Sequence, residues 1–458
     1  MNKIESTLLN VVKKYQSIPL VIAYSGGVDS QVLLHALTRL SHANKITSSV
    51  LVCHVNHGLS ANAQAWQNFA HEQCQLRHVP LKICQVKVKA QAQQSLEALA
   101  RNARYCALQS VVDKPSVIIT GHHSDDQAET FLLALKRGSG LKGLSAMACE
   151  SKKGKDLLVR PFLTITRVEI LHYAQQHSLR WIEDESNLDT RFDRNFIRND
   201  IMPLFSQRWP SIVNTIKRSS EHCREGQLLL DELAVEDLIL CQSKPKCLVV
   251  KPLMTLSLAR FNNLIRYFLA QHFCLMASTE QLKQLHQQLS AMNDKNPAVK
   301  LGDHYIRRYK EQLYLTSDYQ DVTHWQASLI NIKSLTLLDL PDNLGKLTLF
   351  MDESSAEEVL VSERNRECLV APPTKSQQIT IRFNHNNPSC LPEYRNHTRQ
   401  LKKVLQELSI PPWQRKRIPF LYYDDIFVAA IGYFVCQEHV VKANQASLKI
   451  LWHENQSQ

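Results

Sequence analysis

Six consecutive residues near the start of the chain combine the types that suit phosphate chemistry: Ser25, Gly26, Gly27, Val28, Asp29 and Ser30. Glycines let a backbone turn sharply and approach a ligand, and N–H groups at a helix N-terminus form a cradle for phosphate oxygens. The serine hydroxyls can add donors. Asp29 brings negative charge to this anion site, which Mg²⁺ shared with phosphate oxygens explains better than a simple helix cap. The segment therefore predicts nucleotide binding, although no lysine follows as in a Walker loop.

A second constellation occupies residues 120–130, with the sequence TGHHSDDQAET. It follows an apolar run and precedes a helical pattern, and Gly121 is predicted as an ATP-binding residue together with residues 25–30 and His54. Asp125 and Asp126 would then lie at a helix N-terminus, where the helix dipole favours carboxylates. One carboxylate can hold Mg²⁺ and another can accept a proton from an attacking group. We predict Asp29, Asp125 and Asp126 as catalytic and Asp29 and Asp126 as Mg²⁺ ligands, whereas the alternative is a capping cluster.

The elements around these residues predict a doubly wound parallel sheet. Between about residues 18 and 185, short apolar runs alternate with stretches of helical periodicity, which is typical of βαβ units. Residues 156–162 and 180–185 are further strand candidates. Ligands of such sheets bind at the carboxyl ends of the strands, where both constellations are expected to lie. From this topology His54, at the end of the second strand, is expected near the adenine.

The chain of 458 residues exceeds the usual size of a single hydrophobic core. We predict a catalytic domain over residues 1–217, a small and mainly helical middle domain over 218–335, and an acidic connecting region over 336–374. A C-terminal α+β domain is predicted for residues 375–458.

Composition restricts the partners and the compartment. The formal net charge is +11, which favours a polyanion such as nucleic acid, although simple solubility is the alternative. The chain has 12 cysteines but no CxxC pair, and neither Cys53 nor Cys106 has a close partner in sequence. No apolar run is long enough to span a membrane, and the N-terminus has the pattern of an amphipathic helix. We therefore expect a cytoplasmic protein with reduced thiols and no membrane association.

Charged side chains in four regions are candidates for contacts with substrate or RNA. Two pairs lie four residues apart on expected helices, Glu97 with Arg101 and Arg194 with Arg198. The alternative for the first pair is an ordinary ion pair on an exposed helix, and the alternative for the second is a plain charged helix. Residues 394–417 are the most basic stretch and include aromatic residues that can stack on unpaired bases, although a solvated charged face is the alternative. The predicted contacts are Glu97, Arg101, Arg104, Arg160, Arg194, Arg198, Arg399, Lys402, Lys403 and Arg415.

The motif SGGVDS resembles the PP-loop of ATP pyrophosphatases, which cleave ATP between the α- and β-phosphates. Further stretches come in order after it, among them HVNHGLS, WIEDESNLDTRFDRNFIRNDIMPL and LKKVLQELSIPPWQRKRIPFLYYDDIFVAAIG. Together they resemble the tRNA(Ile)-lysidine synthetase family. The match is dense over about residues 20–217, patchy between 245 and 320, and clear again from about 375 to 440.

The resemblance implies an adenine nucleotide α-hydrolase-like fold and a specific reaction. In that family ATP adenylates the wobble cytidine of an isoleucine tRNA with a CAU anticodon, and pyrophosphate is released. Free lysine then displaces AMP and becomes attached to carbon 2 of the base. The product, lysidine, changes the codon from AUG to AUA and the tRNA identity from methionine to isoleucine. The implied requirements are ATP, Mg²⁺, lysine and this tRNA, while the oligomeric state stays open, with a homodimer among the options.

Three alternatives share the same loop or fold. A tRNA thiolase would need reactive or cluster-binding cysteines, for which Cys53 and Cys106 are the candidates in the catalytic domain. An RNA-binding protein without activity would not need all three aspartates. An amidating synthetase for small molecules would have no use for a basic C-terminal domain.

Overall fold

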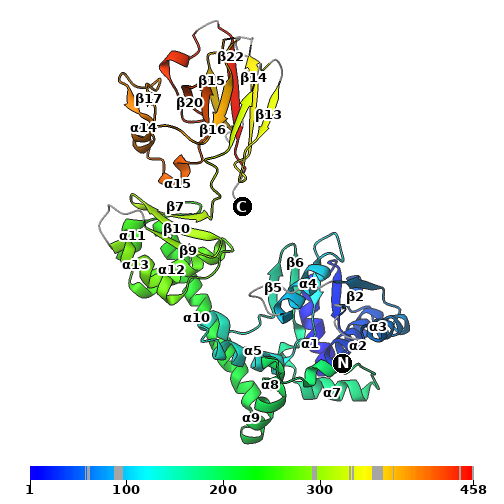
Figure 1. Cartoon of the computed structure of the whole chain (residues 1–458). Helices are drawn as coiled ribbons and strands as arrows, with labels where there is room; N and C mark the ends of the chain where they lie inside the picture. The colour runs from blue at the N-terminus through cyan, green and yellow to red at the C-terminus, as the bar shows by residue number, and fades with distance from the viewer. Residues whose placement is uncertain are drawn as a thin grey trace. The chain divides into compact units, whose positions relative to one another are not determined.

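The computed structural model describes residues 1–56, 58, 62–86, 96–290, 297–329, 332, 335–352, 365–374, 376–442 and 445–455. The chain forms two compact units, Met1–Leu233 and Ala234–Gln458 (Figure 1). In the described part of the chain, no helix has both the length and the apolar character needed to cross a membrane.

A six-stranded sheet forms the centre of the first unit, with the strand order β3-β2-β1-β4-β6-β5. The pairs β1–β2, β1–β4, β2–β3 and β4–β6 are parallel, which confirms the predicted parallel α/β architecture. The strands are β1 (Leu20–Tyr24), β2 (Val50–Asn56), β3 (Leu81–Gln85), β4 (Val117–Ile119), β5 (Glu150–Lys153) and β6 (Asp156–Val159).

Helices cover both faces of this sheet because the strands are apolar on both sides. Leu20 and Ile22 pack into a core with α1, α2 and α7, whereas Val21 between them packs into a second core that includes Leu108 of α4. This alternation follows from the two-residue period of a strand. The helices of the unit are α1 (Lys3–Val12), α2 (Val28–His42), α3 (Ala63–Leu76), α4 (Leu96–Gln109), α5 (Ser124–Lys136), α6 (Leu141–Leu144), α7 (Arg167–Gln176), α8 (Asp193–Phe196) and α9 (Met202–Arg208).

Two details of this sheet differ from the sequence prediction. Residues 180–185 form no strand; instead, the backbone N–H of Ile182 donates to the carbonyl of Gly26 at 2.9 Å. The segment therefore lies against the glycine loop. In addition, β5 pairs with β6 as an antiparallel hairpin that closes around Gly154 with φ +58°. The sequence did not predict β5 because its residues are polar. A charged strand at the edge of a sheet lacks the apolar run by which a buried strand is recognised.

The long helix α10 (Ile212–Cys241) extends from the first unit into the second. It is followed by a five-stranded antiparallel sheet with the order β7-β8-β11-β10-β9 and by three helices. A mainly helical middle domain is therefore not supported, since strands and helices share one core there. The elements are β7 (Gln242–Lys244), β8 (Cys247–Val249), α11 (Val250–Thr255), α12 (Leu258–Gln271), α13 (Thr279–Ser290), β9 (Ala298–Leu301), β10 (His304–Tyr309) and β11 (Gln312–Ser317).

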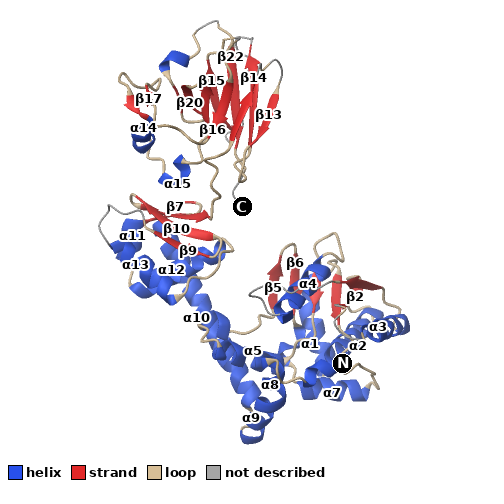
Figure 2. Cartoon of the chain, viewed as in Figure 1, coloured by secondary structure: helices blue, strands red, loops and turns tan. Residues whose placement is uncertain are grey.

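The remainder of the second unit is rich in strands, as Figure 2 shows. Two sheets with the orders β12-β16-β19-β20-β21 and β13-β14-β22-β15 enclose one apolar core. The sheets are built from β12 (Gln326–Leu329), β13 (Thr336–Asp339), β14 (Lys346–Asp352), β15 (Asn365–Val370), β16 (Ile379–Arg382), β19 (Phe420–Tyr423), β20 (Ile426–Ala430), β21 (Phe434–Val435) and β22 (Ser447–His453).

The described parts of residues 336–374 do not behave as a connecting region. β14 and β15 both pair with β22, which lies at the end of the chain. The sequence did not predict these two strands because the stretch is acidic. Their inward residues, such as Leu347 and Val370, are fully buried.

Candidate active site

The hydroxyl group of Ser30 stabilises the conformation of the glycine loop between β1 and α2. Ser30 Oγ accepts from the backbone N–H groups of Ser25 at 3.3 Å and Gly26 at 3.1 Å, and it donates to the carbonyl of Gly27 at 3.0 Å. Gly26 has φ +89°, a conformation that favours glycine. Gly27 is the N-cap of α2, and Val28 begins the helix as a buried residue. The loop thus has the expected strand-to-helix position, with Ser30 organising it rather than pointing outward.

Gly121 brings the end of β4 against the first turn of α2. A Cβ atom at this position would lie 2.8 Å from the backbone oxygen of Asp29 and 2.9 Å from its carbonyl carbon. Because both are main-chain atoms, no side-chain rotation can relieve such a contact. The absence of a side chain at Gly121 therefore sets the distance between the two predicted constellations.

Three carboxylates from the two constellations surround the imidazole of His123. Its Nε2 lies 3.6 Å from Asp29 Oδ1 and 3.5 Å from Asp126 Oδ2, and its Nδ1 lies 3.5 Å from Asp125 Oδ2. His123 is 1% exposed, so these charges interact through a medium that screens them poorly. The sequence predicted that Asp29, Asp125 and Asp126 converge, and the structure brings them together around this histidine.

Two arginines neutralise the deepest of these carboxylates. Asp126 Oδ1 accepts from Arg194 Nη2 at 2.9 Å and from Arg198 Nη2 at 3.0 Å. The same guanidinium groups bind Glu129, at 2.8 Å from Arg194 Nε and at 2.6 Å from Arg198 Nε. Asp126 Oδ2 accepts from the backbone N–H of His123 at 3.0 Å. Both arginines were predicted as contacts to tRNA or substrate, and the structure places them in an internal network that joins α5 to α8 and to residues Ile197–Ile201.

This arrangement shifts the pKa values of the acids in opposite directions. Burial raises the pKa of Asp29 above the usual range, even though His123 opposes the effect. Burial alone would also raise the pKa of Asp126, but His123 and Arg194 outweigh it and hold that pKa below its usual range. For His123, burial is outweighed by the hydrogen bond to Asp125 and by the charges of Asp126 and Asp29, so its pKa is raised.

A neutral histidine and a buried arginine lie next to this network. Thr120 Oγ1 lies 2.7 Å from His122 Nδ1, and burial lowers the pKa of His122 to about 3, a shift that the charge of Arg160 reinforces. Arg160, which is 6% exposed, donates through Nη1 to the carbonyl of Ala148 at 2.8 Å. Arg160, which was predicted as a contact to tRNA or substrate, therefore lies inside the protein.

The other predicted residues of the first unit lie on neighbouring elements. His54, on β2, is buried, and its Nδ1 lies 3.1 Å from the carbonyl oxygen of Tyr24 at the end of β1. Arg101 and Arg104 are exposed on α4, where the guanidinium of Arg101 lies 5.5 Å from the centroid of the Tyr105 ring. The side chain of Glu97 lies outside the described part of α4.

The predicted basic residues of the second unit are arranged around α14 (Leu401–Glu407) and α15 (Pro412–Arg415). Arg399 Nε pairs with Glu407 Oε1 at 3.0 Å, and Lys402 and Lys403 are exposed on α14. Arg415 donates through Nε to the carbonyl of Ile410 at 2.7 Å. The two lysines therefore present charge to solvent, whereas both arginines also make internal contacts.

Comparison with protein families matches three parts of the chain. A PP-loop domain model matches residues 1–205, a TilS substrate binding domain model matches 248–314, and a TilS substrate C-terminal domain model matches 379–452. The tRNA(Ile)-lysidine synthase of Coxiella burnetii is 38% identical, covering 93% of this chain and 91% of its own length. The tRNA(Ile)-lysidine synthase of Escherichia coli O157:H7 is 40% identical, covering 95% and 96%. This chain belongs to the tRNA(Ile)-lysidine synthase family.

A solved structure also resembles the chain in part. The U34-tRNA thiolase NcsA of Methanococcus maripaludis has a TM-score of 0.39 and 19% identity, covering 49% of this chain and 79% of its own. Membership of the tRNA(Ile)-lysidine synthase family rests on the sequence relatives. It confirms the resemblance found in the sequence and the prediction of an ATP-dependent ligase with a PP-loop domain.

Of the two cysteines considered for a thiolase, Cys106 is exposed, whereas Cys53 is placed unfavourably for such chemistry. Cys53 has a neighbour that its sequence spacing concealed, because Cys84 Sγ lies 3.9 Å from Cys53 Sγ. The register of β2 and β3 brings them together, with Val55 opposite Cys84. Cys53 is fully buried, and this burial raises the pKa of its thiol, so a reactive thiolate is disfavoured. Both Cys53 and Cys84 pack in the core that includes Leu108 of α4.

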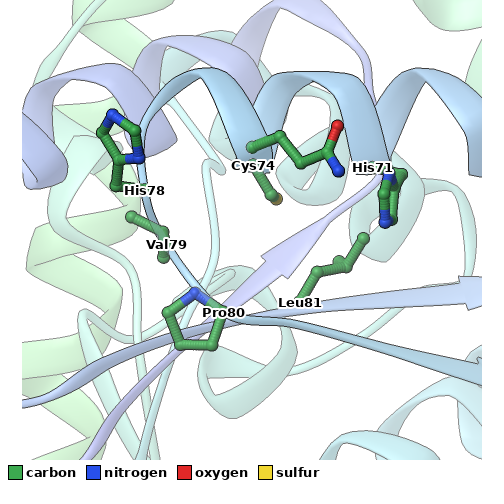
Figure 3. Close-up of a pocket in the computed structure, with 7 residues that line it drawn as sticks. His71, Cys74, His78, Val79, Pro80 and Leu81 are labelled. Carbon is green, nitrogen blue, oxygen red and sulfur yellow. The ribbon is translucent and has the colours of Figure 1, made fainter.

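A separate hollow of about 480 Å³ lies between the end of α3 and the start of β3 (Figure 3). It is lined by His71, Cys74, Gln75, His78, Val79, Pro80 and Leu81. Leu81 pairs with Val52 near the amino ends of the parallel strands, whereas the glycine loop follows the carboxyl end of β1. The hollow therefore lies at the amino ends of the strands, whereas the carboxylates lie at the carboxyl ends.

Proposed function

We propose that this chain joins free lysine to carbon 2 of the wobble cytidine in an isoleucine tRNA with a CAU anticodon. ATP first adenylates the base and releases pyrophosphate, and lysine then displaces AMP. The main support from the structure is the convergence of Asp29, Asp125 and Asp126 around His123 beside a glycine loop at the carboxyl end of β1. Membership of the tRNA(Ile)-lysidine synthase family supports the identity of both substrates.

The loop is suited to the polyphosphate of ATP. Backbone N–H groups and the N-terminus of α2 favour anions, and the positive φ of Gly26 turns the chain sharply beside them. We propose Ser25 through Ser30 and Gly121 as the nucleotide-binding residues, with His54 near the adenine. In this assignment Ser30 stabilises the loop, because its hydroxyl already hydrogen-bonds to the backbone of Gly26 and Gly27.

Asp29 fits a magnesium ion better than Asp126 does. Asp29 Oδ1 is buried and accepts no hydrogen bond from the described residues, whereas both oxygens of Asp126 already accept them. Among the described residues, no three side chains of the metal-binding types form a metal site alone, so an ion would share ligands with phosphate oxygens. We therefore propose Asp29 as the Mg²⁺ ligand; the bound ion would neutralise charge on the phosphates.

Asp125 is the proposed base for the attack by lysine. The ε-amine of lysine has an ordinary pKa of about 10.4, so a proton must be removed before it can attack. Asp125 Oδ2 accepts from the backbone N–H of Arg167 at 2.9 Å, and the side chain is 31% exposed. Although burial alone would raise the pKa of Asp125, the hydrogen bond with His123 lowers it, so this carboxylate is ionised at neutral pH.

The remaining predicted contacts are proposed according to their exposure. Arg101, Arg104, Lys402 and Lys403 are exposed and are assigned to the tRNA backbone, while Glu97 is kept as a predicted contact. Arg160, Arg194 and Arg198 are assigned to the walls of the site, and Arg399 and Arg415 to support of the C-terminal surface. We propose a catalytic domain over 1–217, a middle domain over 218–335, and a C-terminal domain to which 336–374 and 375–458 both contribute.

The test is pyrophosphate release from ATP, measured together with the incorporation of radiolabelled lysine into RNA. Both signals should require the isoleucine tRNA and should be absent with a methionine tRNA that also has a CAU anticodon. Asp29→Ala should abolish both, whereas Asp113→Ala, at an exposed residue before β4, should leave them unchanged. Pyrophosphate release without lysine incorporation would refute the lysidine reaction and favour sulfur or ammonia as the second substrate.

A further inference from the structure

Two phenylalanine rings project into solvent beside the carboxylate–arginine network. Phe192 is 47% exposed and Phe196 is 44% exposed, and they lie at either end of the short helix α8. The backbone N–H of Phe196 donates to the carbonyl of Phe192 at 3.0 Å, so the two residues are one helical turn apart. Exposure of two neighbouring aromatic rings is unfavourable in water unless a partner covers them.

Polar contacts fix this segment while the rings stay outside. Arg194, between the two phenylalanines, donates to Asp126 and Glu129 within the network. Asn195 Nδ2 donates to the carbonyls of Ser186 at 2.8 Å and Asp189 at 3.0 Å. The backbone of α8 is therefore anchored from within, which leaves the rings available for a ligand at little cost in ordering.

The proposed reaction supplies a partner of matching chemistry. A cytosine that reaches Asp29 and Asp126 must leave the stack of its anticodon loop, which deprives the neighbouring bases of their stacking partner. Unpaired bases stack on aromatic side chains in most RNA-binding sites. The hydrogen bond of 2.9 Å from Arg194 to Asp126 connects the segment directly to the carboxylates, and each phenylalanine is two residues from Arg194 in the chain.

Charged side chains flank the rings, which disfavours an apolar partner. Arg191, whose side chain is 88% exposed, precedes Phe192 and pairs with Asp189, and Asp193, which follows Phe192, pairs with Lys136. A patch of two rings within charged groups is small for a protein or membrane interface but matches the size of one or two bases. We propose that Phe192 and Phe196 form a stacking platform for the anticodon-loop bases next to the modified cytidine, a role that rests on the proposed function.

The test removes the rings while keeping apolar side chains. We would prepare Phe192→Leu, Phe196→Leu and the double variant, with the matching tyrosine variants as ring-preserving controls and Leu76→Ala as a control at another exposed apolar residue. The tRNA would contain 2-aminopurine in place of the anticodon adenine, because stacking quenches its fluorescence. The readouts are this fluorescence, the KM for tRNA, and ATP affinity without tRNA.

Loss of both rings should raise the KM for tRNA by about five- to a hundredfold and reduce the quenching, because stacking on an aromatic residue contributes about 1–3 kcal/mol per base. The tyrosine and Leu76→Ala variants should match the wild type, and ATP affinity should not change. An unchanged KM and unchanged quenching in the double leucine variant would overturn the platform, provided that the wild type still forms lysidine. Failure of the wild type to form lysidine would instead overturn the proposed function, and with it this inference.

Discussion

A single methyl group at Gly121 should disable the site. The Cβ of Gly121→Ala would lie 2.8 Å from the carbonyl oxygen of Asp29, and ordinary contact begins near 3.4 Å. The difference of about 0.6 Å must be met by movement of main chain, either at the end of β4 or in the first turn of α2. Asp29 is in that turn, so the proposed Mg²⁺ ligand would move relative to Asp125 and His123.

The expected loss follows from the sensitivity of reactions to geometry. A displacement of about 1 Å costs on the order of a hundredfold in rate, so a shift of roughly 0.6 Å should reduce kcat/KM by about tenfold or more. Overpacking should also lower the free energy of unfolding by about 1–3 kcal/mol. The assays are pyrophosphate release with isoleucine tRNA and lysine, and urea denaturation of the same samples.

Gly140→Ala is the matched control, because a Cβ there would meet no atom within 4 Å and the residue has an ordinary φ of −74°. This variant should retain both activity and stability. If Gly121→Ala were as active as Gly140→Ala, the close approach of β4 to α2 would not set the position of Asp29, and the reasoning would be refuted.

Three other predictions concern the network, the loop and the fold. Glu129→Gln should lower the free energy of unfolding by about 3 kcal/mol, measured by urea denaturation, because two largely buried arginines lose a charged partner; a loss below 1 kcal/mol would contradict this. Ser30→Ala should weaken ATP binding about tenfold in calorimetry, since the loop loses the acceptor of two N–H groups; unchanged affinity would show that the hydroxyl is dispensable. Burial lowers the pKa of His35 to about 4, so the unfolded chain binds its proton first and stability should fall between about pH 6.5 and 4. His35→Gln should flatten that part of a melting-temperature profile, and an equally steep profile would exclude His35 as the cause.

The fold of the first unit could be predicted because two signals agree. The alternation of apolar runs with helical periodicity predicts the strands and helices, and the glycine and aspartate motifs follow the apolar runs. Apolar runs that end in glycine or histidine indicated the strands, and β1, β2 and β4 confirm them. Residues 180–185 mimicked a strand because they are partly apolar, but Ile182 bonds to the loop and not to a neighbouring strand. Such a contact between segments more than 150 residues apart leaves no local pattern.

The partners of charged residues were the hardest feature to predict. Two arginines spaced by four residues are compatible with an RNA-binding face, an ordinary exposed helix or an internal network. Only the fold shows that Arg194 and Arg198 face Asp126 and Glu129. In the same way, the acidic stretch before residue 365 gave no sign that β14 would pair with the last strand, since a pairing between distant segments is set by the core they share.

The internal use of these arginines affects how the enzyme must hold its tRNA. A guanidinium that donates to both Asp126 and Glu129 cannot also neutralise a phosphate without leaving buried carboxylates unpaired, which would be costly. If the chain acts as proposed, we expect exposed groups such as Arg101, Lys402 and Lys403 to meet the phosphate charge, while the site itself receives only a base. Affinity for tRNA should then depend strongly on salt, whereas the step at the carboxylates, inside a poorly screened pocket, should depend on it much less. Measuring the KM for tRNA and the kcat at increasing salt would separate these two contributions, and a kcat that fell as steeply as the affinity would place phosphate contacts inside the site.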